Sequence, residues 1–66
     1  MNTARLSTGE WVTFRQRPDS TWQADTEIYD LPGVLDHHAI GPTPEIALRE
    51  LESFIARRRA AYKDQK

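Results

Sequence analysis

WQADTEI, residues 22–28, decides the fold, because its side chains alternate between apolar and polar types. A period of two places successive side chains on opposite faces of an extended chain, so this segment predicts a β-strand. The residues of the first face are predicted to be buried: Trp22, Ala24, Thr26 and Ile28. Those of the second face are predicted to be solvated and to meet any partner: Gln23, Asp25 and Glu27.

Two more strands are expected before and after this central one. Residues 10–15, EWVTFR, mix aromatic and β-branched residues in alternation and are typical of a strand. The turn-forming residues 18–21, PDST, join that strand to the central one. Residues 34–40, VLDHHAI, are extended and partly apolar and stop at Gly41, which predicts the third strand.

A helix is expected to follow the strands. Thr43 precedes Pro44 and Glu45, an order in which the hydroxyl caps free backbone N–H groups, Pro loses no hydrogen bond and Glu meets the positive helix end. Apolar residues then recur at spacings of three and four, which predicts one face packed on the sheet. This stripe comprises Ala47, Leu48, Leu51, Phe54, Ile55 and Tyr62.

This order of elements predicts an α+β fold (β-β-β-α), in which a three-stranded antiparallel sheet carries one carboxy-terminal helix on one face. The 66 residues suffice for one small domain. We place it at residues 10–62, between a flexible arm at 1–9 and a frayed basic tail at 63–66. The other sheet face has no cover, so we expect it to be solvated or to meet a second copy or a partner.

Composition excludes several classes of function. The chain has no Cys, so disulfides, thiolate metal sites and a thiol nucleophile are excluded. The formal net charge is −1, so no overall field selects nucleic acid or an acidic membrane. No apolar run approaches the roughly 20 residues of a membrane span, and no signal peptide is recognised, which predicts a cytoplasmic location.

No catalytic, cofactor or metal site is predicted, and the chain is not expected to be an enzyme. His37 and His38 are neighbours on a strand and point to opposite faces, so we expect one to be partly buried and the other solvated, with no shared metal. The serines lack a neighbouring base or a Gly-flanked elbow. The aspartates are explained as turn and solvent-face residues.

Ordered motifs run from the hairpin turn into the helix. They comprise Asp19 in the turn, Trp22 in the central strand, the corner Asp30, Leu31, Pro32 and Gly33, the helix entry Gly41, Thr43, Pro44 and Glu45, and the pair Ala47 and Leu48. In this order and spacing, residues 19–57 resemble the amino-terminal domain of HicB-like antitoxins.

The resemblance implies a non-enzymatic protein-interaction module that folds over a small ribonuclease toxin of the HicA type and blocks it. The acidic residues Asp25 and Glu27 would then meet a basic surface of the toxin. HicB-like proteins usually add a carboxy-terminal DNA-binding domain, for which the residues after the helix are too few. We therefore expect a stand-alone or truncated module that does not repress an operon alone.

Two other functions stay open. The uncovered sheet face and small core suit a homodimeric scaffold of the HicB fold, or a phage-derived regulator without a toxin partner. Residues 57–66 carry a net charge of +4 against −5 for residues 1–56, which allows weak nucleic-acid binding without base readout. We favour a solvated helix end for this basic patch, which comprises Arg57, Arg58, Arg59 and Lys63.

Overall fold

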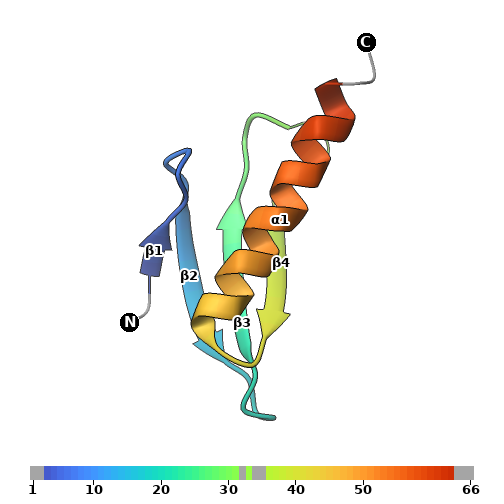
Figure 1. Ribbon diagram of the computed structural model, residues 1–66. Coiled ribbons are helices and arrows are strands. Elements are labelled where there is room, and N and C mark those ends of the chain that lie inside the picture. Colours follow the sequence, from blue (N-terminus) through green and yellow to red (C-terminus); the bar gives the residue numbers. More distant parts are fainter. Residues whose placement is uncertain (1–2, 32, 34–35, 64–66) are drawn as a thin grey trace.

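The computed structural model describes residues 3–31, 33 and 36–63, and these form a sheet covered on one face by a single helix (Figure 1). The elements in chain order are β1 Thr3–Arg5, β2 Trp11–Gln16, β3 Trp22–Glu27, β4 Asp36–Gly41 and α1 Pro44–Lys63. The α+β class and the carboxy-terminal helix are confirmed. The described part of the sheet has four strands, however, rather than the three predicted.

The sheet is an antiparallel meander in which each strand pairs with its neighbours in the chain, in the order β1-β2-β3-β4. Ala24 of β3 lies opposite Phe14 on one side and Ala39 on the other. Ala24, Thr26 and Ile28 are buried, as the alternation predicts, because α1 covers this face. The start of the third predicted strand, Val34, lies outside the described residues.

β1 lies inside the segment predicted to be a flexible arm, and that prediction is wrong for residues 3–9. Its three residues pair with β2, with Ala4 opposite Val12. The Leu6 N–H donates to the Glu10 carbonyl (2.9 Å), and the Gly9 N–H donates to the Leu6 carbonyl (2.9 Å). Leu6 is also buried in the core. An apolar anchor and a closed turn therefore order this part of the chain.

The core lies between α1 and the sheet, with α1 running across β3 and β4 (Figure 1). Its buried apolar residues are Leu6, Val12, Phe14, Ala24, Ile28, Leu31, Ala47, Leu51 and Ile55. Phe54 and Tyr62 were predicted to face the core, but they are 38% and 50% exposed. The buried helix positions follow a spacing of four, which leaves Phe54 beside the stripe, and the last turns of α1 extend past the strands.

Side-chain hydrogen bonds stabilise the predicted helix start and the predicted hairpin turn. The Thr43 hydroxyl accepts from the Ile46 N–H at 3.2 Å, so the expected helix cap is confirmed. In the β2–β3 turn, Asp19 Oδ1 accepts from both the N–H (3.1 Å) and the hydroxyl (2.6 Å) of Thr21. These bonds, chiefly the one from the hydroxyl, lower the pKa of Asp19. Asp19 is therefore a turn residue, as predicted.

Candidate functional site

The face of the sheet opposite α1 is uncovered, and we call it the open face. The register of the strands assigns its members, because directly opposite residues in an antiparallel pair project to the same side. They alternate along each strand with the residues that face α1, and they comprise Thr3, Arg5, Trp11, Thr13, Arg15, Gln23, Asp25, Glu27, Asp36, His38 and Ile40. The open face is thus polar, with three carboxylates on its two last strands.

A shallow depression of about 850 Å³ occupies one end of the open face. Trp11 of β2, Asp25 and Glu27 of β3, and Asp36 and His38 of β4 line it, together with Tyr29 just beyond β3. Trp11 and Tyr29 are 60% and 70% exposed, so two aromatic rings remain accessible beside these acidic groups. The depression therefore combines charged and aromatic surface.

Glu27 and Asp36 form a like-charged cross-strand pair in this depression. They are direct partners in the β3–β4 register, and both are exposed. Like charges in this position repel each other. The ion pairs among the described residues include neither of them. The Tyr29 hydroxyl donates to Glu27 Oε1 at 2.7 Å, and this bond, with the Glu27 charge, raises the pKa of Tyr29.

A chain of polar contacts runs along β3 beside the depression. Arg17 donates to Gln23 Oε1 (3.1 Å), and Gln23 Nε2 donates to Asp25 Oδ1 (2.8 Å). Arg15 lies 3.9 Å from Asp25 Oδ2. Gln23 is only 7% exposed, so its predicted place as a solvated contact residue is wrong: its neighbours cover it. Asp25 is half-buried, which leaves Glu27 as the exposed acidic residue of the three predicted.

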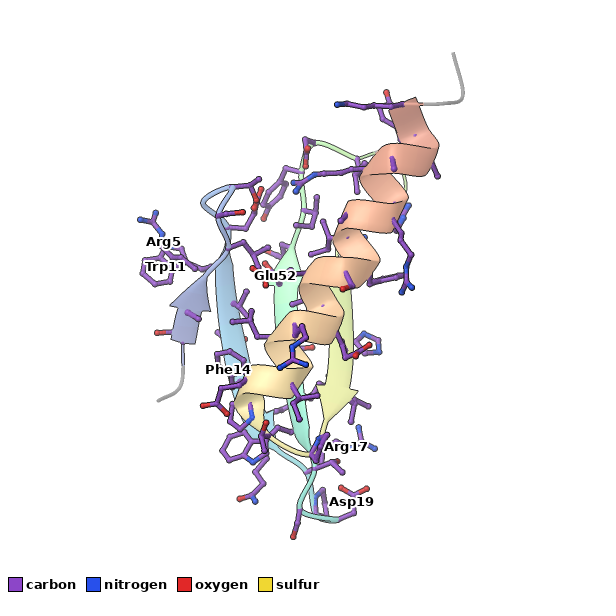
Figure 2. All side chains as sticks on the ribbon, in the orientation of Figure 1. Arg5, Trp11, Phe14, Arg17, Asp19 and Glu52 are labelled. Atoms are coloured by element: carbon purple, nitrogen blue, oxygen red, sulfur yellow. The ribbon has the colours of Figure 1, made fainter. Side chains whose placement is uncertain are left out.

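Trp11 does not enter the core. It pairs across the strands with Arg5, whose guanidinium carbon lies 4.5 Å from the centre of the indole ring (Figure 2). At this distance the cation is attracted to the electron-rich face of the ring. Trp11 is therefore a cross-strand partner, and its indole ring already binds one guanidinium of the chain itself.

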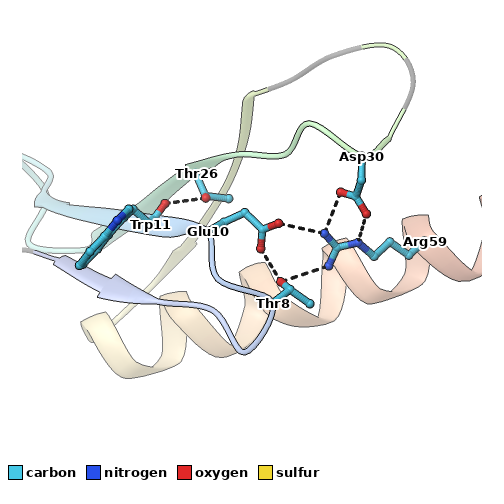
Figure 3. A network of polar contacts seen from close by, with 6 residues as sticks. All are labelled: Thr8, Glu10, Trp11, Thr26, Asp30 and Arg59. Atoms are coloured by element: carbon cyan, nitrogen blue, oxygen red, sulfur yellow. Dashed lines mark hydrogen bonds and ion pairs between the residues drawn. The ribbon is translucent and has the colours of Figure 1, made fainter.

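Arg59 of the predicted basic patch is engaged inside the molecule rather than solvated. Its guanidinium donates to both carboxylate oxygens of Asp30 (3.0 and 2.8 Å) and to Glu10 Oε2 (3.3 Å), and the Glu10 carboxylate also accepts from the Thr8 hydroxyl (Figure 3). This cluster ties the β1–β2 turn, the segment after β3 and α1 together. The bonds from Arg59 lower the pKa of Asp30, and those to Asp30 raise the pKa of Arg59.

Arg58 is also engaged, because its Nη1 lies 2.7 Å from Nε2 of His37. Arginine is always a donor, so Nε2 is the acceptor in this contact. His37 is 2% exposed and packs against Phe54, while His38 is exposed on the open face, as the alternation predicts. Of the basic patch, only Arg57 and Lys63 are exposed. The described charges available for phosphate contact are therefore fewer than the sequence indicates.

The motif residues of the corner and of the helix entry have structural roles. Leu31 is in the core, and Gly33 has a φ of +91°, which favours glycine. Gly41 is buried against the start of α1, and Pro44 and Glu45 form its first turn. Pro32 lies outside the described residues.

The ion pair between Asp30 and Arg59 predicts that the stability of the fold depends on pH. A carboxyl whose folded-state pKa is lowered stabilises the fold above its unfolded pKa, about 3.9 for Asp, and loses that contribution as the pH falls through the folded value. Asp30→Asn should therefore lower the Tm near neutral pH, and the difference from the wild type should shrink below about pH 4. Thermal melts monitored by circular dichroism across this range measure it.

The Arg59→Met variant is the control for this prediction. In that background, Asp30→Asn should change the Tm little at any pH, because the partner of the carboxylate is gone. An undiminished effect of Asp30→Asn without Arg59 would contradict the assignment of the pKa shift to this contact.

Sequence reasoning missed Asp36, Trp11 and Tyr29 as members of the site. Asp36 could have been found, because it alternates with His38 and Ile40 along the third predicted strand. Tyr29 carries no such signal, since it lies beyond the end of β3.

Within residues 3–31, 33 and 36–63, no group of three or more His, Asp or Glu side chains is arranged to hold a metal ion. No described helix is long and apolar enough to cross a membrane.

Fold and site together define a small two-layer α+β domain with one acidic and aromatic sheet face left open. No protein-family model matches the chain, and comparisons with curated proteins and with solved structures find no significant match.

Proposed function

We propose that this protein is a non-enzymatic interaction module of the HicB-like antitoxin type, which binds a small basic ribonuclease toxin on its open face. The resemblance of residues 19–57 to that family suggests the class of partner. The observation that carries the proposal is the pair of exposed carboxylates, Glu27 and Asp36, which are direct partners on an uncovered sheet and belong to no ion pair among the described residues. A basic partner would relieve this repulsion, and opposite charge on two surfaces favours encounter and register.

The charge distribution over the molecule also favours the open face as the surface that binds a basic partner. Two further carboxylates, Glu10 at the margin of the depression and Asp30 outside it, share the single positive charge of Arg59. Arg58 is turned toward His37. The open face therefore keeps Glu27 and Asp36 available, while part of the positive charge at the helix end is used inside the fold. A ribonuclease that binds RNA phosphates has a basic surface, which such carboxylates can cover in place of RNA.

Charge reversal on the open face tests this proposal. The chain is co-expressed with the toxin-like product of a neighbouring small gene, and growth rescue and co-purification are measured. Glu27→Lys/Asp36→Lys should abolish rescue and weaken binding by about tenfold or more, from two exposed charge pairs and the new repulsion. Glu50→Lys/Glu52→Lys makes the same charge change on exposed positions of α1 and should bind normally. Equal losses in both variants, or no rescue by the wild type, would exclude the proposal.

A second candidate function is supported by the edge strand β4. Its six residues, DHHAIG, contain neither Pro nor Lys, two residues that proteins use to keep sheet edges unpaired. Pairing of two β4 strands would make a homodimeric scaffold with one continuous sheet. Sedimentation velocity at several concentrations tests it: a dimer that Ile40→Pro dissociates would support this function, and a monomer at every concentration would exclude it.

A further inference from the structure

We infer that the depression on the open face is a receptor for an arginine side chain of the partner, held by the Glu27–Asp36 pair and the exposed rings of Trp11 and Tyr29. The inference rests on the proposed function, because it takes the open face as the docking surface, and it adds which chemical group the partner must present. It separates recognition of arginine from attraction to any basic surface.

The geometry of the carboxylate pair favours one planar cation. Side chains directly opposite each other on antiparallel strands have Cβ atoms about 5 Å apart, so the two carboxylates can be reached by one group. A guanidinium presents five N–H donors in a flat fork, and it can bind two carboxylates at once. A lysine ammonium is a compact point charge that is more strongly hydrated than a guanidinium. It has no planar fork of N–H donors with which to bind two carboxylates side by side.

The aromatic lining strengthens the preference for arginine. Guanidinium groups stack on aromatic faces as well as pairing with carboxylates. The contact between Arg5 and Trp11, at 4.5 Å, is an example of this chemistry at the margin of the same depression. The Tyr29 hydroxyl is bonded to Glu27, which places an aromatic side chain beside the carboxylate that the ligand would meet. Carboxylates and aromatic rings thus converge on one place in the sheet.

The depression is also open enough to admit a side chain from a folded partner. Its volume of about 850 Å³ exceeds that of a single side chain, and it lies on the uncovered face rather than under α1. The neighbouring carboxylate Asp25 already has Arg15 and Gln23 as partners. Of the carboxylates that line the depression, Glu27 and Asp36 are thus the two that belong to no ion pair among the described residues, and the arginine would bind there.

Two peptides of equal charge test the inference. One has three arginines separated by glycines, and the other has lysines at the same places. The Trp22→Phe variant leaves Trp11 as the only tryptophan, so its fluorescence reports binding at the depression. The arginine peptide should bind about three- to fivefold more tightly than the lysine peptide, from one cation–π contact and a second hydrogen bond to carboxylate. Glu27→Gln and Asp36→Asn should each remove most of this preference, whereas Glu50→Gln should retain it.

The outcomes separate this inference from the proposed function. Equal affinities for the two peptides, or an arginine preference that persists in Glu27→Gln, would overturn the inference. So would the absence of saturable binding by either peptide. If the lysine reversals at Glu27 and Asp36 still abolish toxin binding in those cases, the proposed function stands with a general charge contact. If the reversals have no effect, both fall.

Discussion

Leu51→Asp should unfold the domain. Leu51 is fully buried at the centre of the helix face that packs on the sheet. An aspartate there would bring a charge without a partner into the only core of the described structure, at a cost of several kcal/mol. A core of this size rarely yields more than about 3–5 kcal/mol of stability. The penalty is therefore as large as the whole free energy of unfolding. Circular dichroism should show loss of the cooperative thermal transition.

Ser53→Asp is the matched control for this variant. It introduces the same side chain two positions further along α1, at an exposed site. Its effect on the free energy of unfolding should stay within about 0.5 kcal/mol, as is usual for surface changes. A cooperative, native-like melt of Leu51→Asp would show that the assigned helix face is wrong.

Gly41→Ala should be the second most damaging change, because β4 and the start of α1 approach each other closely there. A Cβ at this position would lie 2.8 Å from the Ala47 backbone nitrogen and 3.0 Å from Cγ2 of Ile46. The nearer atom belongs to the backbone of the first helix turn, where the Ala47 N–H donates to the Thr43 carbonyl at 2.9 Å. It cannot rotate away, so the helix must shift, at a cost of about 1–3 kcal/mol.

Gly33→Ala serves as the comparison for Gly41→Ala. A Cβ on Gly33 would meet nothing within 4 Å, so its cost comes from the positive φ alone, about 1–2 kcal/mol. Chemical denaturation measures both losses. NMR shifts of the Ile46 and Ala47 amides should change strongly in Gly41→Ala and little in Gly33→Ala. Unchanged helix amides in Gly41→Ala would contradict the close approach.

The local parts of the fold were predictable because they depend on neighbouring residues. Alternation over residues 22–28 predicted which face of β3 is buried, and the Thr43 cap marked the start of α1 within one residue. β1 was missed because three residues are too few to show a period. The alternating pair Ala4 and Leu6, followed by Gly9, was its only signal.

The partners of the charged residues could not be predicted in the same way. Arg59 binds a carboxylate 29 residues away and another 49 residues away, so its contacts depend on the completed fold. From sequence it is one of three adjacent arginines, with nothing to distinguish it from Arg57. The burial of Gln23 is likewise set by Arg17 and Asp25 around it, rather than by its place in the alternation.

The position of the only described helix at the end of the meander has a consequence for synthesis of the protein. All four strands are made before α1, so the apolar side of the sheet has no cover while residues 44–63 are added. At about 5–20 residues per second, these twenty residues take about 1–4 s. Until α1 packs on the sheet, Val12, Phe14 and Ile28 lack the cover that they have in the folded protein. The newly made sheet is therefore most prone to aggregation before α1 packs on it.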